Sequence, residues 1–304
     1  MSAEGSRLAV VAAFFVNLAI SIAKFVAAGL TGSSAMLSEG FHSVADTGNQ
    51  LMLLYGMKAA RRPATTAHPF GRGKESYFWS FMVAVMLFAG GAVLAIQHGI
   101  DALRHPHEIK NLTPSFWVLS ISIGLEVVSF TVAVRQFNRV RGSRSVWRSI
   151  RDTKDASLVV VLLEDTAALV GLVVALAGTS LAAATGNGLY DGLASLVIGA
   201  ILAVVAVLLA IETKALLIGE AASRADRGAI RSTLLAMPEV ESVGRILTMQ
   251  LGPNELLVNI EVDLDEGLAA EEIADSVRRA EAAIQVALPA AKHISIELHS
   301  DERA

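Results

Sequence analysis

Residues 36–58 read MLSEGFHSVADTGNQLMLLYGMK, a long segment in which a few polar groups interrupt apolar residues. A helix of about 20 residues is long enough to cross the hydrocarbon core of a membrane. His42 and Asp46 are four positions apart, so a helix would place the imidazole and the carboxylate on one face, one turn apart. Ionisable side chains at membrane depth are costly, rare and usually functional. This stretch therefore predicts a membrane helix with a functional polar site.

A second apolar segment, residues 156–182, carries Glu164 and Asp165 at similar depth. Together with His42 and Asp46, these side chains predict a divalent-metal site between two helices. The alternative is a structural hydrogen-bonded pair between helices, but two further acidic groups have no evident structural purpose. Because neighbouring residues on a helix point about 100° apart, we expect only one of the two to face the ion well. Asp165 is the first choice as a ligand, and Glu164 is a ligand, a group that orients a ligand, or a proton carrier.

Other polar residues in the apolar segments leave alternatives open. Asn49 follows Asp46 by three positions on the same face, and its amide is a metal ligand, a partner of a ligand, or a helix-packing group. Glu39 belongs to an entry path or lies near the membrane interface, which we favour. We expect Glu126 to relay protons or pair with a polar neighbour, Asp191 to be interfacial or a helix cap, and Lys24 to snorkel or form a pair.

The composition indicates a protein that crosses the membrane several times. The mean hydropathy is +0.54, and the 304 residues are 53% hydrophobic and only 18% charged. A soluble protein of this length is rarely so apolar. Six apolar segments are long enough to cross, near residues 8–30, 35–57, 76–102, 114–136, 156–182 and 189–214. No Cys is present, so metal ligands must be His, carboxylate, amide or water.

The basic residues predict the orientation. Residues 58–74 contain five Lys or Arg and residues 135–154 contain seven, whereas the loops predicted on the other side contain only Arg104 and Lys110. Cytoplasmic loops carry the excess of Lys and Arg, so both termini are expected in the cytoplasm. We expect a multi-pass protein of the bacterial inner membrane, or of an organelle membrane in the equivalent orientation.

The composition changes near residue 220. Residues 220–304 hold sixteen acidic and eight basic side chains, whereas the preceding part has a net charge of +4. Hydrophobic periodicity predicts helices at 224–237 and 269–287 and strands at 241–250, 255–263 and 293–299, in the order αββαβ. We therefore predict a transport domain of residues 1–219 and a small α+β domain of residues 220–304. About 80 residues give a thin core, so we expect this domain to dimerise.

Histidines outside the central segments are weaker candidates for metal binding. A lone loop His is more often structural than a ligand, and a terminal pair offers too few ligands for a closed site. These residues are His68 in a basic loop, His98, His105 and His107 on the far side, and His299 with Asp301 at the end of the last predicted strand.

With these motifs in place, the chain resembles the cation diffusion facilitator family over nearly its whole length. SEGFHSVAD at 38–46 resembles the family's His-x-x-x-Asp half-site, and HPFGRGKE at 68–75 resembles its loop before the third helix. LLEDTAA at 162–168 with TGNGLYD at 185–191 is similar to the branch that contains the animal mitochondrial zinc transporter. The resemblance implies a six-helix α-helical membrane protein with a cytoplasmic, metallochaperone-like αββαβ domain.

The chain departs from the family pattern at several positions. Members usually repeat His-x-x-x-Asp in the fifth helix, but Val161 stands four positions before Asp165, which makes Glu164 the substitute. A second site in the family's loop is not expected, because Arg72 and Thr65 occupy the corresponding positions. In the tail only His299 and Asp301 match family metal ligands. Lys74 resembles a Lys that pairs between subunits, and the nearest acidic candidate is Glu220.

The resemblance and the residues together predict a transporter and not an enzyme. We expect efflux of a divalent metal, Zn²⁺ first, in exchange for protons, through a single site between the second and fifth helices. Metal and protons compete for the same imidazole and carboxylates, which antiport requires. The expected partners are the ion, protons, the bilayer and a second copy of the chain, with no nucleic acid and no cofactor besides the transported ion. The alternatives are a membrane metal sensor or assembly subunit, or a family exporter of Mn²⁺, Fe²⁺, Co²⁺ or Cd²⁺. No nucleophile motif supports an intramembrane enzyme.

Overall fold

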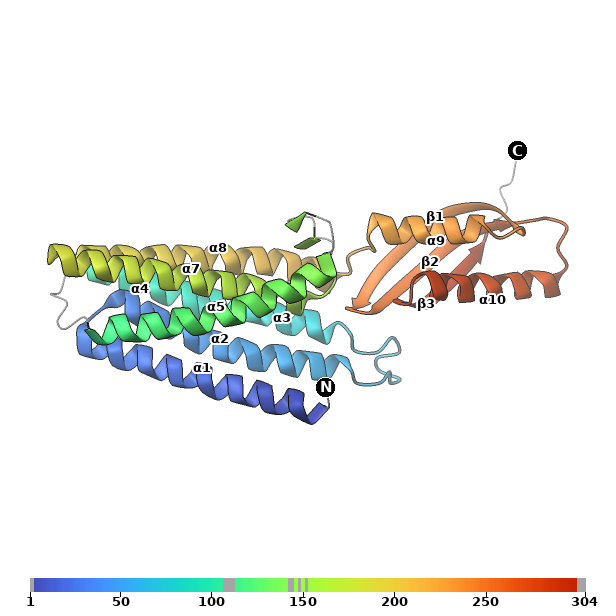
Figure 1. Cartoon of the computed structure of the whole chain (residues 1–304). Helices are drawn as coiled ribbons and strands as arrows, with labels where there is room; N and C mark the ends of the chain where they lie inside the picture. The colour runs from blue at the N-terminus through green and yellow to red at the C-terminus, as the bar shows by residue number, and fades with distance from the viewer. Residues whose placement is uncertain (1–2, 106–112, 142–144, 147–148, 151–152, 300–304) are drawn as a thin grey trace. The chain divides into compact units, whose positions relative to one another are not determined.

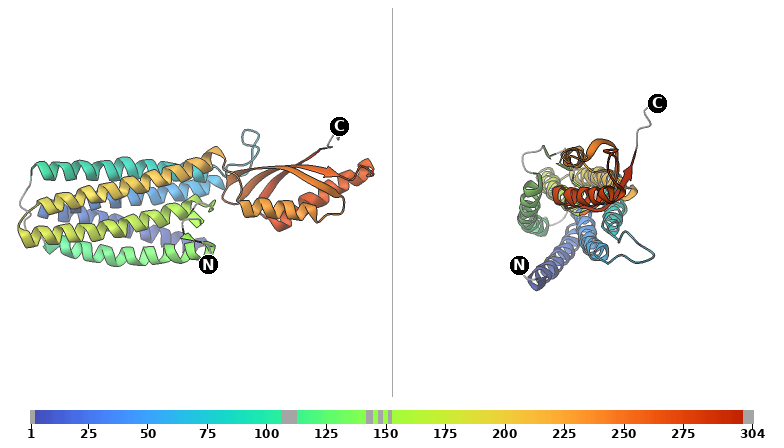
Figure 2. Two further views of the ribbon diagram at one scale, coloured as in Figure 1. Left: turned by 90° about the horizontal axis from the view of Figure 1, so that it is seen from above. Right: turned by 90° about the vertical axis from the view of Figure 1, so that its right-hand side faces the viewer.

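The structure, a computed structural model, describes residues 3–105, 113–141, 145–146, 149–150 and 153–299, without the side chains of residues 3–16 and 140. Its described part contains six long helical segments: α1 (Ala3–Thr31), α2 (Ser34–Ala60), a third segment made of α3 (Glu75–Met86), η1 (Leu87–Ala92) and α4 (Val93–Arg104), then α5 (Thr113–Arg141), α7 (Ala156–Thr185) and α8 (Leu189–Ile218). Each predicted span lies within one of these segments. They run side by side, as Figures 1 and 2 show.

The described residues divide into two compact units. The first, called the helical unit, draws on Met1–Gly56, Trp79–Ile150 and Ser157–Thr213. The second, called the C-terminal unit, draws on Met57–Phe78, Arg151–Ala156 and Lys214–Ala304. The C-terminal unit thus includes the loop between α2 and α3, an association that the sequence did not reveal. The predicted division of function at residues 219 and 220 stays a prediction.

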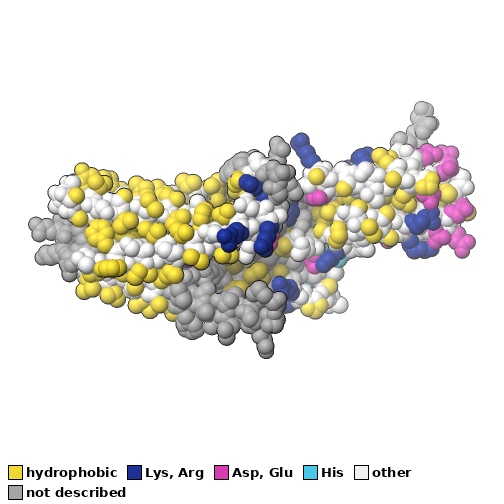
Figure 3. Space-filling model, viewed as in Figure 1, with side chains coloured by type: hydrophobic (Ala, Val, Ile, Leu, Met, Phe, Trp, Pro, Cys, Tyr) yellow, Lys and Arg dark blue, Asp and Glu magenta, His cyan; other side chains and the backbone are white. Residues whose placement is uncertain are grey.

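The helical unit has the length and surface of a membrane-spanning bundle. Within the described residues, four segments are long and apolar enough to cross a membrane: Glu75–Arg104, Thr113–Arg139, Ala156–Thr185 and Leu189–Ile218. Asn17–Thr31 of α1 adds a shorter apolar stretch, and α2 has the length but many polar residues. Apolar side chains cover the outer faces of the helices in Figure 3, and those exposed include Val128, Trp117 and Val204. The chain is therefore an α-helical multi-pass membrane protein.

Small residues bring the third segment and α8 together. A Cβ added at Gly99 would lie 2.8 Å from the Leu196 side chain, and one added at Gly199 would lie 2.6 Å from that of Ile96. Without water to exclude, membrane helices gain affinity from such close packing of small residues. The third segment also contains the π-helical turn η1, which is buried at Leu87, Gly91 and Ala92. A Cβ added at Gly91 in this turn would lie 3.3 Å from the Leu202 side chain.

The C-terminal unit contains a two-layer α+β fold in the predicted order. The elements are α9 (Arg224–Leu235), β1 (Val240–Gly252), β2 (Glu255–Leu264), α10 (Ala270–Ala287) and β3 (Ala291–Leu298). The central strand β2 pairs antiparallel with β1 and parallel with β3. Alternate β2 residues are buried from Leu256 to Val262, and they pack with Ile230 of α9 and Ile284 of α10. The period of two along the strand therefore builds one apolar face, which the two helices cover.

The loop between α2 and α3 packs on the turn between β1 and β2 within the C-terminal unit. A Cβ added at Gly73 would lie 2.5 Å from the Leu251 carbonyl oxygen and 2.9 Å from the Gly252 Cα atom. Phe70 contacts the His293 ring edge to face at 5.2 Å. Only glycine fits a contact between two backbones at this distance.

Two charged residues near this loop have partners within the chain. The Lys74 ammonium approaches the Met249 sulfur at 3.8 Å, and Glu220 pairs with Lys154 at 2.8 Å. The Lys154 carbonyl oxygen accepts a hydrogen bond from the Tyr77 hydroxyl at 3.1 Å. Glu220 is therefore engaged within its own chain, and the pairing of Lys74 between subunits stays a prediction.

The Gly73 contact yields a stability prediction. Gly73→Ala forces the loop away from the β1–β2 turn, and overpacking of this kind costs about 1–3 kcal/mol. We expect the full-length protein in detergent to melt at a lower temperature, as followed by tryptophan fluorescence. Gly228→Ala in α9 is the matched control, because its added Cβ meets no atom within 4 Å and alanine favours the helix. Equal melting temperatures for Gly73→Ala and the wild type would contradict the contact.

Candidate functional site

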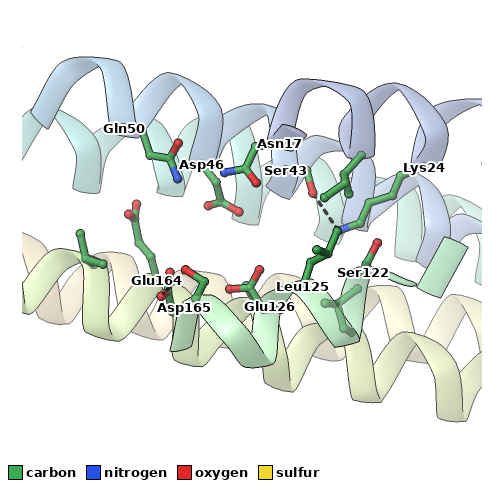
Figure 4. Close-up of a pocket in the computed structure, with 15 residues that line it drawn as sticks. Asn17, Lys24, Ser43, Asp46, Gln50, Ser122, Leu125, Glu126, Glu164 and Asp165 are labelled. Atoms are coloured by element: carbon green, nitrogen blue, oxygen red, sulfur yellow. Dashed lines mark hydrogen bonds between the residues drawn. The ribbon is translucent and has the colours of Figure 1, made fainter. Parts of the chain in front are cut away.

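A polar cavity of about 90 Å³ lies among α1, α2, α5 and α7 of the helical unit. Four carboxylates line it: Asp46 of α2, Glu126 of α5, and Glu164 and Asp165 of α7. In Figure 4, Asp46 and Gln50 extend from one side, while Glu126, Glu164 and Asp165 extend from the other. A cavity needs only about 10–15 Å³ to hold one water molecule, so this one has room for several. Such a cavity suits a small cation with part of its hydration shell.

The α2 side of the site combines His42 and Asp46 as predicted. Their Nδ1 and Oδ1 atoms lie 3.4 Å apart across one helical turn. His42 is fully buried, and neither of its ring nitrogens makes a hydrogen bond among the described residues. A buried imidazole without hydrogen bonds is costly. His42 does not line the cavity itself, but it contacts Asp46, which does.

The α7 side presents two carboxylates that turn toward different helices. The Asn49 amide of α2 donates a hydrogen bond of 2.5 Å to Glu164, and the Ser129 hydroxyl of α5 donates one of 2.9 Å to Asp165. This divergence agrees with the 100° between neighbouring residues, although both side chains still line the cavity. Asn49 is therefore a partner of Glu164 in this structure and does not itself line the cavity. Val161, where the family has His, also lines it.

The structure gathers most of the predicted residues without closing them into a coordination sphere. Asp46, Glu164 and Asp165 share the cavity, His42 contacts Asp46, and Asn49 contacts Glu164. Among the described residues, no three His, Asp or Glu side chains lie close enough together to hold a metal ion. The metal role of all five residues therefore stays a prediction.

Sequence reasoning left Glu126 and Gln50 out of the predicted ligand set. Both line the cavity. Glu126 is expected from the sequence to relay protons or to pair with a polar neighbour, and its position in the middle of a span also permits a role as a ligand. Gln50 follows Asp46 by four positions on α2, so the helical period alone would have placed it on the same face.

A buried ion pair borders the cavity. The Lys24 ammonium of α1 lies 3.0 Å from the Glu39 carboxylate and donates a hydrogen bond of 2.7 Å to the Ser43 hydroxyl. Lys24 is 3% exposed and Glu39 is fully buried. Lys24 therefore forms a pair, one of its two predicted alternatives. The two alternatives for Glu39, an entry path or the membrane interface, stay predictions.

Asp191 holds the start of α2 in place. Its carboxylate accepts hydrogen bonds from the Ser33 hydroxyl at 2.6 Å, from the Ser34 backbone at 2.5 Å and from the Ala35 backbone at 3.1 Å. The first backbone N–H groups of a helix lack partners within it, and a carboxylate there also complements the helix dipole. Asp191 is thus a cap, as one alternative predicted, but it caps α2 and not its own helix α8.

The weaker His candidates do not join the acidic cavity. His98 stacks on Phe41 with 5.2 Å between ring centroids. The His105 Nδ1 atom, just after the end of α4, lies 3.4 Å from the Asp101 carboxylate. His98, Asp101 and His105 line a separate, wider cavity of about 330 Å³. His68 and His299 are exposed, and His107 and Asp301 lie outside the described residues.

Comparisons with known proteins agree on one family. A family model described as the cation efflux transmembrane domain matches residues 10–218. The mitochondrial proton-coupled zinc antiporter SLC30A9 of Xenopus laevis is 33% identical over 268 residues, which cover 87% of this chain and 48% of that protein. Its Homo sapiens counterpart is 31% identical, with 86% and 46% covered. Metal tolerance protein C4 of Arabidopsis thaliana is 30% identical, with 86% and 58% covered. The chain thus spans about half the length of these relatives.

The Asp191 cap can be tested by its effect on stability. Asp191→Ala leaves the Ser34 and Ala35 N–H groups without an acceptor, and each buried unsatisfied group costs about 1–3 kcal/mol. We expect a clearly lower melting temperature in detergent. Asp101→Ala is the control at the same end of the helices, because its pair with His105 is exposed and worth little. A variant Asp191→Ala as stable as Asp101→Ala would show that α2 does not depend on this cap.

Proposed function

The chain belongs to the cation efflux family, as its motifs predicted, and on this premise we propose that it carries a divalent metal ion across a membrane in exchange for protons. Zn²⁺ is the proposed first substrate. The observation that carries the proposal is the cavity lined by four carboxylates inside a membrane-spanning bundle. Carboxylates in apolar surroundings need cations or protons as partners, and an antiporter supplies each in turn.

The chemistry of the available ligands supports Zn²⁺. Zinc is bound in proteins by imidazole nitrogen and carboxylate oxygen, commonly with four ligands. In the proposed bound state, His42 and Asp46 provide one half of the coordination sphere. Asp165 and Glu164 provide the other half, and Glu164 takes the place of the absent fifth-helix His. The names of the zinc antiporters among the relatives agree with this choice.

In the proposed cycle, metal binding requires α2 and α7 to move closer together than in this structure. Among the described residues, no three His, Asp or Glu side chains are close enough to coordinate one ion. In the proposed cycle, the hydrogen bonds from Asn49 to Glu164 and from Ser129 to Asp165 hold the carboxylates when no metal is bound. Metal binding then exchanges these partners for the ion. Protons that reach the carboxylates and His42 weaken metal binding, which couples release of the ion to a proton gradient.

The proposal includes an orientation and an assembly. Both termini lie on the side of the basic loops at 58–74 and 135–154, which is the cytoplasmic side of a bacterial inner membrane or its equivalent in an organelle. Two copies associate through the residues after 219, whose small core gains apolar contacts in a dimer. The C-terminal part then acts as a dimerisation and regulatory domain.

Zinc flux into proteoliposomes tests the proposal directly. Purified protein is reconstituted with an internal zinc-sensitive dye, and the pH gradient is imposed in either direction. We expect zinc uptake that follows the outward proton gradient and reverses with it. The competing reading, a metal sensor or assembly subunit, predicts zinc binding without flux. A panel of Mn²⁺, Fe²⁺, Co²⁺ and Cd²⁺ in the same assay ranks the ions.

Loss of one carboxylate from either side should stop transport. Asp46→Ala and Asp165→Ala each remove a charged ligand, and even residues that only orient a ligand cost about 10–100-fold in metal affinity. We therefore expect losses of at least that size in zinc flux, with the melting temperature nearly unchanged. Asp101→Ala, at an exposed carboxylate outside this cavity, is the control. Normal flux in both cavity variants would exclude the proposed site.

Glu164 has a test that uses the departure from the family. Glu164→Gln keeps the size of the side chain but removes its charge, so we expect zinc flux to fall by more than about tenfold. Glu164→Ala should be similarly impaired. Val161→His added to Glu164→Ala places an imidazole four positions before Asp165, and we expect it to restore part of the flux. Full activity of both Glu164 single variants would leave the ion to His42, Asp46 and Asp165 alone.

A further inference from the structure

Lys24 lines a cavity that otherwise presents four carboxylates, and among its described lining residues it is the one basic side chain. Its ammonium is held by Glu39 at 3.0 Å and by Ser43 at 2.7 Å, and only 3% of the residue is exposed. Replacing such a buried ion pair with apolar residues is often neutral or stabilising. Stability alone therefore gives little reason for a buried ion pair at this position.

The Glu39 carboxylate is held by Lys24 through one oxygen and lies beside the α7 backbone with the other. One oxygen accepts from Lys24, and the other lies 2.7 Å from the point where a Cβ at Gly171 of α7 would stand. Glu39 therefore approaches the backbone of α7 at Gly171, where an added Cβ would displace the carboxylate. Its second oxygen makes no hydrogen bond among the described residues. The pair Lys24–Glu39 thus links α1 to α2, and its Glu39 carboxylate also packs beside α7.

The ion pair and the acidic cavity share one helix interface. Glu39 precedes Asp46 by seven residues on α2, and Gly171 follows Glu164 by seven residues on α7. Residues seven apart lie on the same face of a helix, two turns and about 10 Å along its axis. The pair therefore lies close enough for its charges to act on an ion in the cavity, because burial weakens screening by salt.

We propose that Lys24 is a built-in counter-charge that sets the affinity of the cavity for divalent cations, and that Glu39 balances it. This inference rests on the proposed function. With both charges present, the pair contributes little net field, and the ion binds tightly enough to be loaded but not so tightly that it cannot leave. Removing either member unbalances the field. The two removals must then change metal affinity in opposite directions.

The directions follow from the charge that is changed. Lys24→Met removes a cation that repels Zn²⁺ from the cavity, so Zn²⁺ should bind about tenfold more tightly and its flux should slow. Glu39→Gln leaves the Lys24 cation unbalanced, so Zn²⁺ should bind about tenfold more weakly. The double variant Lys24→Met with Glu39→Gln removes both charges and should return to within about threefold of the wild-type affinity. Each tenfold change corresponds to about 1.4 kcal/mol.

Zinc titration calorimetry on the full-length protein in detergent measures these affinities at one fixed pH. Lys24→Arg keeps the charge and should rescue the wild-type value. Lys58→Met, which removes an exposed lysine from the end of α2, is the matched control and should bind zinc normally. Helical content and melting temperature are recorded for every variant. If Lys24→Met does not fold, the proposal still requires weaker binding by folded Glu39→Gln and wild-type binding by Lys24→Arg.

A purely structural ion pair predicts a different pattern. Both single variants would then lose stability and shift affinity in the same direction, or not at all, and either result overturns the counter-charge. Failure of the proposed function looks different, because the wild-type protein would then show no zinc flux. Absence of zinc binding as well removes both proposals, whereas normal wild-type flux and binding with unshifted variants removes only the role of Lys24.

Discussion

Charged groups buried among membrane helices must find partners within the protein, and this constraint explains the arrangement of the helical unit. The cavity among α1, α2, α5 and α7 collects four carboxylates, and two of them, Glu164 and Asp165, accept a hydrogen bond from a neighbouring helix. Asn49 holds Glu164, Ser129 holds Asp165, and Lys24 holds Glu39. A neutral hydrogen-bond donor interacts with a carboxylate more weakly than a divalent cation does. In the proposed function, carboxylates that have only such donors as partners stay available to bind a cation.

The rest of the bundle supports the position of α2, the helix that carries His42 and Asp46. Asp191 of α8 caps its first turn, and glycines at 99 and 199 let the neighbouring helices α4 and α8 pack closely. Gly171 of α7 leaves room for Glu39. These features are local in chemistry but act over the length of the helices, because a rigid helix that is held at one end transmits its position to a site two or three turns away.

Much of the fold was predictable because its causes are local. A membrane span requires a long and largely apolar segment, so apolar residues located the six helical segments, including the more polar α2. The period of two located the β2 strand. The i, i+4 spacing placed His42 beside Asp46. Contacts between helices were not predictable, since a single sequence contains no record of which faces meet. The pair of Lys24 with Glu39, the cap that Asp191 provides to another helix, and the sharing of one cavity by Glu164 and Asp165 all depend on that tertiary arrangement. The packing of the loop at Gly73 on the β1–β2 turn was not predictable either, because it also depends on the tertiary arrangement.

In the proposed function, one divalent cation binds within the membrane between α2 and α7. A cryo-electron microscopy structure of the full-length protein in lipid nanodiscs, determined with zinc and with a chelator, would locate this ion. We expect a zinc-dependent density bounded by His42, Asp46, Glu164 and Asp165, with the two helices closer together than in the metal-free state. Zinc density at His98 and His105 or in the C-terminal unit, with none between α2 and α7, would contradict it.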